Sequence, residues 1–465
     1  MCDSDPQENK PEGPKMDADT TGISRAEPNS GYYQSRKGTS DEVLTRIGPG
    51  TPAGEYLRRY WQPVALVSDI GELPTPLRIL GEDLVLFRDL SGRIGLVHKN
   101  CPHRRASLEY GKCESRGIRC CYHGWLFDVD GAVLEVPGQP DGIEKRVQNA
   151  VTLGAYPTHE YKGIVFAYLG PPDKKPAFPI YDTFEFPGQI MRPYKAPFKC
   201  NWLQVLDAIL DPIHTAFLHS RISREQFSEG FGEIGEMEFF ERFMSYLGAA
   251  TRRVEDNIWV RVNELVLPNF TQAGAAFAAD GTTPRYFGRT AFSRWVVPID
   301  DENTICIAWA NFGDRGDPVE YDTPEGPELI EQGEVFDRTP EEKQRYPADA
   351  EATEGMGPIT EHSKEYLVPS DKGIVTYRRK LRKIIKALQD GTEPDRLTDR
   401  YNGPVPTYGG DTVLAIGKDS TDDAALLRKV GRQVMDIQFD AEHLTGDDRD
   451  EAVISKLREI EKALP

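Results

Sequence analysis

A chain of 465 residues is long enough for two or three domains with a sizeable core. Its content of 38% hydrophobic and 28% charged residues is ordinary for a soluble globular protein. The formal net charge of −19 argues against nucleic acid or an anionic membrane as the main partner. No apolar run is long enough to predict a membrane-spanning helix.

The cysteines and the N-terminus indicate a reducing compartment. The seven cysteines are at positions 2, 101, 113, 120, 121, 200 and 306. An odd number with three crowded into residues 113–121 does not fit a secreted disulfide framework. The first 22 residues contain no apolar run of the kind that a signal sequence carries. We therefore expect a cytoplasmic protein.

The N-terminal part of the chain predicts an acidic tail followed by a small β domain. Residues 1–42 are rich in Asp, Glu, Pro, Ser and Gly and poor in large aliphatic side chains, which predicts a disordered tail. After a helical turn near residues 51–61, residues 63–140 read as short strands with a hairpin turn at Asp130–Gly131. We expect this domain to span residues 43–185.

The remaining residues, 186–465, predict an α+β domain. A helical period runs from Asn201 to His219, and residues 236–312 alternate between apolar and polar, as in an antiparallel sheet with one face on a core. A helix is expected at 370–391, stopped by its final glycine. Two further helices, at about 422–437 and 449–463, form a C-terminal extension.

Two cysteine–histidine pairs predict a first metal site. Cys101 and His103 form a C-x-H pair, and sixteen residues later Cys120 and His123 form a C-x-x-H pair. Two thiolates and two imidazoles suit either a tetrahedral zinc ion or a Rieske [2Fe–2S] cluster. Two further interpretations are a structural zinc knuckle and buried free thiols with unrelated histidines. The flanking sequences "CPHRRASL" and "CYHGWLFD" resemble Rieske cluster loops, whereas a zinc knuckle does not need the Gly-Trp pair.

A second group of ligands interrupts the apolar stretch "LDAILDPIHTAFLHSR". It contains Asp207, Asp211, His214 and His219, and charges buried in such a stretch are costly unless they are paired or bind a metal. Histidines five residues apart lie roughly 140° apart around a regular α-helix. They can bind one metal only if the helix ends or deforms between them. Two histidines and a distant carboxylate would form the facial triad of a non-haem Fe(II) oxygenase. The alternative is a core helix whose histidines are satisfied by hydrogen bonds.

The two motifs together resemble the catalytic (alpha) subunit of Rieske non-haem iron oxygenases, over roughly residues 43–390. "GPGTPAGEYLRRYWQPV", "NWLQVLD" and "GMGPI" further resemble the phthalate dioxygenase branch, which includes aryl-ether O-demethylases. The resemblance implies a catalytic domain with a curved antiparallel sheet wrapped by helices, a helix-grip or START-like fold. It also implies that two residues, Cys101 and Cys120, hold one iron of the cluster and that His103 and His123 hold the other.

By the same resemblance, a mononuclear Fe(II) is held by His214, His219 and an aspartate that precedes "MGPI". In "PADAEATEGMGPI" that aspartate is Asp349, with Glu351 and Glu354 as competitors. One departure from the branch is Asp207, which replaces a longer Glu and is expected to shift the residues around the iron ligands. Another is His362, which stands where an Arg is common.

The resemblance also implies a reaction and partners. Electrons from NAD(P)H would pass through a separate flavin- or ferredoxin-type reductase to the cluster. O₂ would oxidise a small, carboxylated aromatic substrate by ring hydroxylation or dioxygenation. O-demethylation of methoxylated aromatic acids is the alternative reaction. The subunits would form a homotrimer or a dimer of trimers, in which Asp211 bridges the cluster of one subunit to the iron of its neighbour. A Rieske electron carrier or a zinc-stabilised binding protein are the non-enzymatic alternatives.

Candidates for the substrate pocket follow from the same helix and from the strands. The apolar residues beside the iron ligands either line the pocket or belong to the core: Leu206, Leu210, Ile213 and Phe217. A substrate carboxylate would need a strand arginine, for which Arg289 and Arg294 are candidates. Cys121 lacks the spacing of a cluster ligand, and we expect a packed thiol turned away from the cluster.

Overall fold

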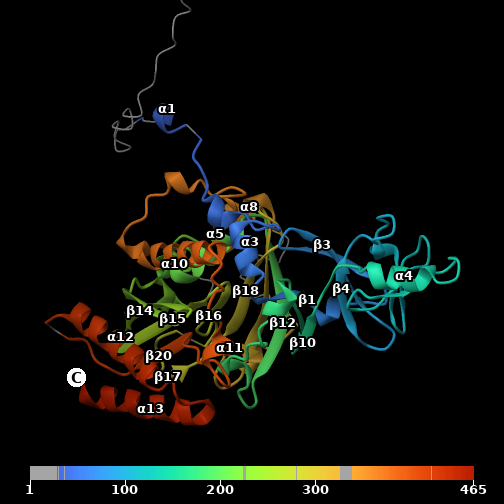
Figure 1. Ribbon diagram of the computed structural model, residues 1–465. Helices are drawn as coiled ribbons and strands as arrows, with labels where there is room; N and C mark the ends of the chain where they lie inside the picture. Colours follow the sequence, from blue (N-terminus) through green and yellow to red (C-terminus); the bar gives the residue numbers. More distant parts are fainter. Residues whose placement is uncertain are drawn as a thin grey trace, which may run out of the picture.

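Two bodies of unequal size make up the molecule, as the ribbon of the computed structural model shows (Figure 1). The structure describes residues 29, 31–35, 37–223, 227–278, 280–324, 338–419 and 421–464. Most of the expected tail, residues 1–28, lies outside these ranges. Among the described helices, none has the length and apolar character needed to cross a membrane.

The smaller body, which we call the cluster domain, comprises residues 75–157 and projects from one side of the molecule (Figure 1). One of its sheets has the order β2-β3-β4-β9, with strands Thr75–Ile79, Glu82–Arg88, Ile94–His98 and Ala155–Tyr156. The other has the order β5-β6-β7-β8, with strands Lys112–Glu114, Gly117–Arg119, Leu126–Phe127 and Val133–Glu135. The expected hairpin is present. Its turn between β7 and β8 contains Gly131, which has a positive φ of 87°. These strands enclose a core of their own, and the short helix α4 (Ile143–Ala150) packs on β8.

The flanking segments of the expected 43–185 domain belong to the larger body. Helices α2 (Glu42–Thr45) and α3 (Pro52–Leu57) share its main core, as does the sheet of β1 (Trp61–Leu66), β10 (Thr158–Tyr161) and β11 (Ile164–Tyr168). Residues of the cluster domain, among them Leu84 and Leu86, also belong to this main core. The domain boundaries at residues 43 and 185 stay a prediction.

The N-terminal boundary also differs from the prediction. Thr39 N donates to Ser363 Oγ at 2.8 Å, and Ser363 N donates to Thr39 O at 3.1 Å. Asp41 caps α2 and accepts a hydrogen bond from Arg382 Nε at 2.6 Å. Residues 39–42 were assigned to the tail but pack against the body, because acidic side chains at this position meet specific donors.

A nine-stranded antiparallel sheet forms the larger body, as the alternating pattern predicted. The main path runs β12-β19-β18-β16-β15-β14-β13, and β17 and β20 complete the sheet through β15. The strands are β12 (Ile190–Phe198), β13 (Glu236–Arg242), β14 (Ser245–Val254), β15 (Asn257–Val266), β16 (Phe270–Ala273), β17 (Arg285–Gly288), β18 (Phe292–Pro298), β19 (Thr304–Phe312) and β20 (Gly410–Leu414). The chain thus has the α+β architecture that was expected. β20 was not predicted, because its five residues follow a Pro- and Gly-rich segment.

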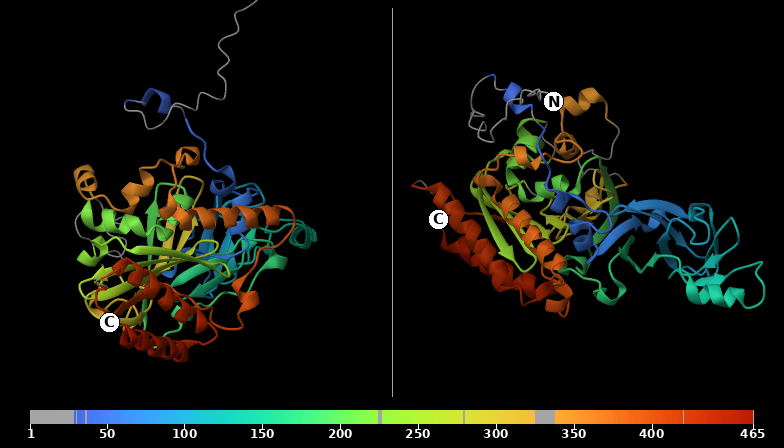
Figure 2. Two further views of the ribbon diagram at one scale, coloured as in Figure 1. Left: turned by 90° about the vertical axis from the view of Figure 1, so that its left-hand side faces the viewer. Right: turned by 45° about the horizontal axis from the view of Figure 1, so that its top comes forward.

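Both faces of this sheet are covered by other elements, whereas the alternating pattern predicted a core on one face alone. On β14, Tyr246 belongs to the main core, whereas its neighbour Leu247 belongs to a second core under the C-terminal helices. Side chains of adjacent strand residues point to opposite faces. The main core lies under α5 (Trp202–Asp207) and α10 (Lys372–Gln389), and the second lies under α12 (Asp423–Asp440) and α13 (Gly446–Ala463). Figure 2 shows the two C-terminal helices in red along one side of the larger body. The helices α10, α12 and α13 lie within a few residues of their predicted bounds.

A buried ion pair joins the cluster domain to the larger body. Arg58, which follows α3, donates to Glu82 Oε1 on β3 at 2.9 Å and also to the carbonyl of Ile47 at 3.1 Å. Tyr156 Oη donates to Glu82 Oε2 at 2.6 Å. Burial by itself would raise the pKa of Glu82, but hydrogen bonds from His98, Tyr156 and Arg58 outweigh burial and lower it to about 2.

We predict that Glu82→Gln weakens the contact between the cluster domain and the larger body, and that the loss of stability depends on pH. Because folding lowers the Glu82 pKa below its ordinary value of 4.5, the ionised carboxylate stabilises the fold above pH 4.5, and this contribution is lost as the pH falls towards 2. The variant should be less stable by about 1–3 kcal/mol at neutral pH, since solvent screens part of the interaction. Urea unfolding followed by near-ultraviolet circular dichroism from pH 7 to pH 3 measures this. A difference that is the same at every pH would contradict the assignment.

Candidate metal centres

Two loops with the same backbone geometry form the tip of the cluster domain. In one loop Cys101 N donates to Ala106 O at 2.9 Å and Arg105 N donates to Cys101 O at 2.9 Å. In the other, Cys120 N donates to Trp125 O at 2.8 Å and Gly124 N donates to Cys120 O at 3.1 Å. The fifth residue of each loop is left-handed, with φ of 66° at Arg105 and 69° at Gly124. The different spacings C-x-H and C-x-x-H therefore belong to matching turns.

The predicted ligands converge at this tip from both loops. Cys101 and Cys120 are buried, with 2% and 3% of their surface exposed, and their thiols are in hydrogen-bond contact. Burial is the main cause that raises the pKa of the Cys101 thiol to about 11, although the backbone N–H groups of His103 and Arg104 donate to its sulfur. The rings of His103 and His123 lie 4.7 Å apart, and His103 is exposed. The buried sulfurs and outward imidazoles give the site a dry side and a solvent side.

The spacing of these four ligands fits a two-iron cluster better than a single zinc ion. In a tetrahedral zinc site all ligand atoms lie within about 4 Å of one another. Within the described part of the chain, only His214, His219 and Asp349 bring three possible ligand atoms within 4.8 Å of one another. A [2Fe–2S] cluster is larger and binds its cysteines and histidines through different irons. Trp125 stacks on His103 with 4.7 Å between the ring centres and 4° between the planes, which fixes one imidazole.

The expectation for Cys121 was half wrong. The thiol is exposed, whereas a packed thiol was predicted. Its spacing to His123 still does not fit a cluster ligand. The residue lies on the outer side of its loop beside Tyr122, which is 56% exposed and lies under Arg104. Its neighbour Cys120 occupies the one position of the turn that points inward.

The second ligand group lies where an α-helix changes into a π-helical turn. Asp211 starts α6 (Pro212–Ala216) and accepts from the backbone N–H groups of Ile213 at 3.0 Å and His214 at 3.3 Å. The π turn Phe217–Arg221 follows, closed by the hydrogen bond from Ile222 N to Phe217 O at 2.8 Å. The wider turn brings residues five apart onto one side. The predicted deformation is confirmed, and the rings of His214 and His219 lie 5.1 Å apart.

Asp349 completes this group from a different part of the chain. It is the first residue of α9 (Asp349–Glu354), and its Oδ1 lies 3.5 Å from His219 Nε2 and 3.8 Å from His214 Nε2. Burial would raise the pKa of Asp349, but the charges of His219, His214 and Arg294 outweigh it and hold the pKa below its ordinary value. The group therefore offers a carboxylate and two imidazoles to a metal ion.

The two competing acids bind elsewhere. Glu351 accepts from Arg338 Nη2 at 2.6 Å and from Ala348 N at 2.9 Å, at the start of α9. Glu354 accepts from Lys199 N at 2.8 Å. Both side chains satisfy donors away from the two imidazoles, which favours Asp349 as the third ligand.

Asp207 and His362, the two departures from the branch, have structural partners. Asp207 accepts hydrogen bonds from Tyr377 Oη and from the Arg378 guanidinium, whose Nη1 also donates to Glu365 at 2.7 Å. The shorter acid is thus paired within the interior by α10. His362 Nδ1 accepts from Asp41 N at 3.2 Å, so this residue anchors the N-terminal segment.

The structure divides the pocket candidates into two groups. Leu206 and Leu210 are fully buried in the main core. Ile213 is half-buried and Phe217 is 39% exposed beside the π turn. A residue that was not predicted, Phe227, packs on His219 at 5.5 Å between ring centres.

The two arginine candidates also differ. Arg289 is 1% exposed and donates to Asp182 at 2.7 Å and Asp450 at 3.1 Å, so it belongs to a buried ion network and is excluded as a substrate anchor. Arg294 lies on β18, opposite Ala308 of β19, and its charge reaches Asp349. Sequence alone could not separate them, because both were expected on strands; in the structure Arg289 follows the end of β17, whereas Arg294 lies within β18.

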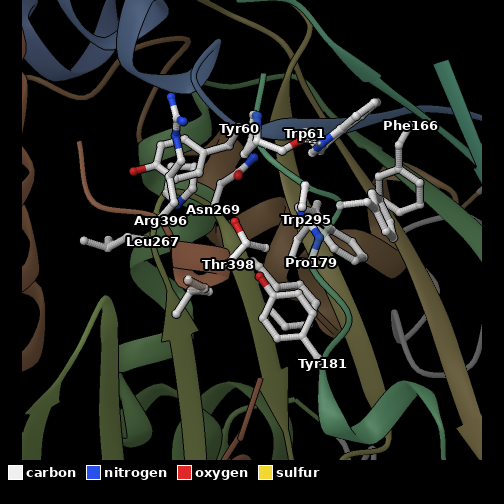
Figure 3. A pocket seen from close by; sticks show the side chains of 16 residues that line it. Tyr60, Trp61, Phe166, Pro179, Tyr181, Leu267, Asn269, Trp295, Arg396 and Thr398 are labelled. Atoms are coloured by element: carbon white, nitrogen blue, oxygen red, sulfur yellow. Dashed lines mark hydrogen bonds between the residues drawn. The ribbon is translucent and has the colours of Figure 1, made fainter. Parts of the chain in front are cut away.

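An aromatic-lined hollow elsewhere in the molecule is not the substrate pocket (Figure 3). It lies between β1 and the large sheet, with Trp61, Tyr181 and Trp295 in its wall, and contains none of the predicted ligands. Its volume of about 40 Å³ is far below the roughly 150 Å³ of a cavity that holds benzene. This hollow is a packing gap between two parts of the core.

Comparisons with known proteins agree with both metal centres. Residues 60–157 match the family model of the Rieske [2Fe–2S] domain. A tert-butanol monooxygenase / tert-amyl alcohol desaturase oxygenase subunit of Aquincola tertiaricarbonis is 39% identical, over 94% of this chain and 97% of that protein. The phenoxybenzoate dioxygenase subunit alpha of Ectopseudomonas oleovorans is 39% identical, over 78% of this chain and 88% of that protein. The chain belongs to the Rieske non-haem iron oxygenases.

The fold agrees with this membership. The crystal structure of dicamba monooxygenase bound to dicamba superposes with a TM-score of 0.53 and 18% identity, covering 73% of this chain and all of that chain. As an oxygenase subunit, this protein carries a [2Fe–2S] cluster and a non-haem iron, and reductase electrons from NAD(P)H are typical of the family. When bound, the non-haem iron supplies the O₂ chemistry of the family.

We predict that Cys120→Ser removes the cluster, whereas Cys121→Ser retains it. Cys120 is the inward residue of a turn that matches the Cys101 turn, and Cys121 points to solvent. The visible absorption and the electron paramagnetic resonance (EPR) spectrum of the reduced proteins measure cluster content. Equal loss in the two variants would contradict the ligand assignment, and Cys121→Ser controls for a change of thiol at the same loop.

Proposed function

We propose that this oxygenase hydroxylates or dioxygenates a carboxylated aromatic substrate at an iron held by His214, His219 and Asp349. The observation that carries the proposal is the row of side chains around Arg294. On one face of the sheet, Arg294 of β18 lies opposite Ala308 of β19, which lies opposite Tyr194 of β12. Alanine leaves room above the sheet, and a guanidinium binds a carboxylate in a bidentate manner.

The neighbouring row supports an apolar site next to the iron ligands. Phe292 lies opposite Ala310, and these residues pack in one cluster with Ala308, Tyr194 and Phe227. Phe227 in turn contacts His219. This group of apolar side chains is thus continuous from the iron ligand His219 to the alanines beside Arg294. An aromatic ring with its carboxylate at Arg294 would meet apolar walls and would face the iron ligands.

The residues around His214 prepare it to bind iron. His214 Nδ1 contacts the carbonyl oxygen of Asp211, which can only accept, so the proton is on Nδ1. Nε2 then carries a free electron pair and faces Asp349. A backbone carbonyl therefore fixes the tautomer and the orientation of the ligand.

We also propose that electrons reach the iron from the cluster of a neighbouring copy of the chain. The cluster tip lies on the projecting domain, and the iron ligands lie in the larger body (Figure 1). Both the cluster tip and the iron site reach the surface. His103 is exposed at the tip, and 33% of the Asp211 side chain is exposed beside the iron ligands. Exposed apolar side chains flank them, with Tyr122 at the tip and Ile222, which is 66% exposed, beside the π turn. A ring of subunits, as in the expected homotrimer, would cover these side chains and join the two centres.

A second candidate substrate is a tertiary alcohol. The relative named for tert-butanol matches 94% of the chain, which exceeds the 78% matched by the relative named for phenoxybenzoate. An uncharged alcohol would not need Arg294. O-demethylation of a methoxylated aromatic acid uses the same site residues and differs only in the product.

A substrate panel with Arg294→Met tests the proposal. For phthalate- or phenoxybenzoate-like acids, the variant should raise KM at least tenfold because the carboxylate loses its cation, while the matching methyl esters should be unaffected. Product analysis distinguishes a cis-diol or phenol from released formaldehyde. Turnover of tert-butanol but of no aromatic acid, equal in wild type and variant, would favour the second candidate.

For electron transfer, Asp211→Asn should retain both metal centres and slow single turnover by at least tenfold. Asparagine still caps α6, so the helix remains, but the negative charge between the two histidines is lost. Rapid mixing of reduced enzyme with O₂ and substrate, followed by the oxidation of the cluster, measures the rate. A wild-type rate in the variant would show that the carboxylate does not couple the centres.

A further inference from the structure

One buried amide connects the two segments that carry the iron ligands. Gln204 lies on α5, is 2% exposed, and is the polar exception in the stretch "WLQVL". Its Nε2 donates to the carbonyls of Thr353 at 2.9 Å and Gly357 at 3.0 Å, and its Oε1 accepts from Thr360 N at 2.9 Å. All three partners are backbone groups of α9 and the residues that follow it.

The arrangement of these hydrogen bonds admits one orientation of the amide. The carbonyls of Thr353 and Gly357 can only accept, and Thr360 N can only donate, so the nitrogen and oxygen of Gln204 cannot exchange places. Both ends of the side chain are therefore used, and the side chain spans a fixed distance. Such a link specifies position as well as stability.

The Gln204 side chain links two elements, α5 and α9, that are far apart in the sequence. α5 leads directly into the segment with His214 and His219, and α9 begins at Asp349. Asn201 N donates to Pro358 O at 2.8 Å and adds a backbone contact between the same two segments. The facial arrangement of the ligands depends on how these segments are held against each other.

We propose that Gln204 is a positioning residue for the non-haem iron, which sets the separation between the Asp349 carboxylate and the two imidazoles. It does not contact the metal. Without the amide, two carbonyls and one N–H group would lose their partners in a dry interior, and the α9 segment would shift to satisfy them. The ligand distances would then change. The inference rests on the assignment of His214, His219 and Asp349 as the iron ligands.

The test uses Gln204→Met, which keeps the length and volume of the side chain and removes the three hydrogen bonds. Enzyme that retains its cluster but has lost the non-haem iron is titrated with Fe(II) under anaerobic conditions. We expect the Kd for Fe(II) to rise at least tenfold, with an unchanged cluster spectrum. The EPR signal of the nitric oxide adduct of the bound iron should change shape, because the ligand geometry has changed.

A matched control is Gln62→Met. Gln62 is fully buried and also has an amide used at both ends: its Nε2 donates to Leu57 O at 3.1 Å, and its Oε1 accepts from Asn269 Nδ2 at 2.8 Å. None of these partners belongs to an element with an iron ligand. This variant should lose a comparable amount of thermal stability and bind Fe(II) normally.

The experiments distinguish a failure of the Gln204 proposal from a failure of the iron-ligand assignment on which it rests. Equal weakening of Fe(II) binding in Gln204→Met and Gln62→Met, or wild-type binding and an unchanged signal in Gln204→Met, would overturn the positioning role. His214→Ala should lose the iron altogether while keeping the cluster. Normal Fe(II) binding by His214→Ala would instead overturn the ligand assignment.

Discussion

The π-helical turn at Phe217–Arg221 is the constraint on which the catalytic part of the structure depends. A regular α-helix would direct His214 and His219 about 140° apart, and no single ion could bind both. The wider turn aligns them, but such a turn is rare and needs support from its surroundings. Support comes from Asp211, which caps the helix at its start, and from the buried contacts of α5 that precede it.

Charge around the iron site is balanced in pairs within a largely apolar interior. Asp349 lies against two imidazoles, and Asp207 shares Arg378 with Glu365. A buried carboxylate is tolerated only with such a partner. The shorter acid at position 207 therefore leaves no charge of its own unpaired behind the ligands.

The two metal centres are built in contrasting ways. The cluster loops are local: each turn is closed by its own backbone, and the ligands of each pair lie within a few residues. The iron site is assembled from α6 with the π turn that follows it and from α9, which is distant from them in sequence. The loops place His103 at an exposed tip, which suits exchange of electrons with another surface, whereas His219 is 2% exposed.

The sequence by itself predicted the four cluster ligands and the two histidines, through short motifs and the family resemblance that these motifs carry, and it predicted the α+β class through local periodicity. It also indicated that the helix must deform between the histidines. Only the tertiary structure decided which arginine acts electrostatically on Asp349, that Cys121 is exposed, and that Glu351 and Glu354 have other partners. It also showed that Gln204 connects α5 to α9. Such contacts join residues far apart in the chain, and a linear pattern contains no information about which buried donor meets which acceptor.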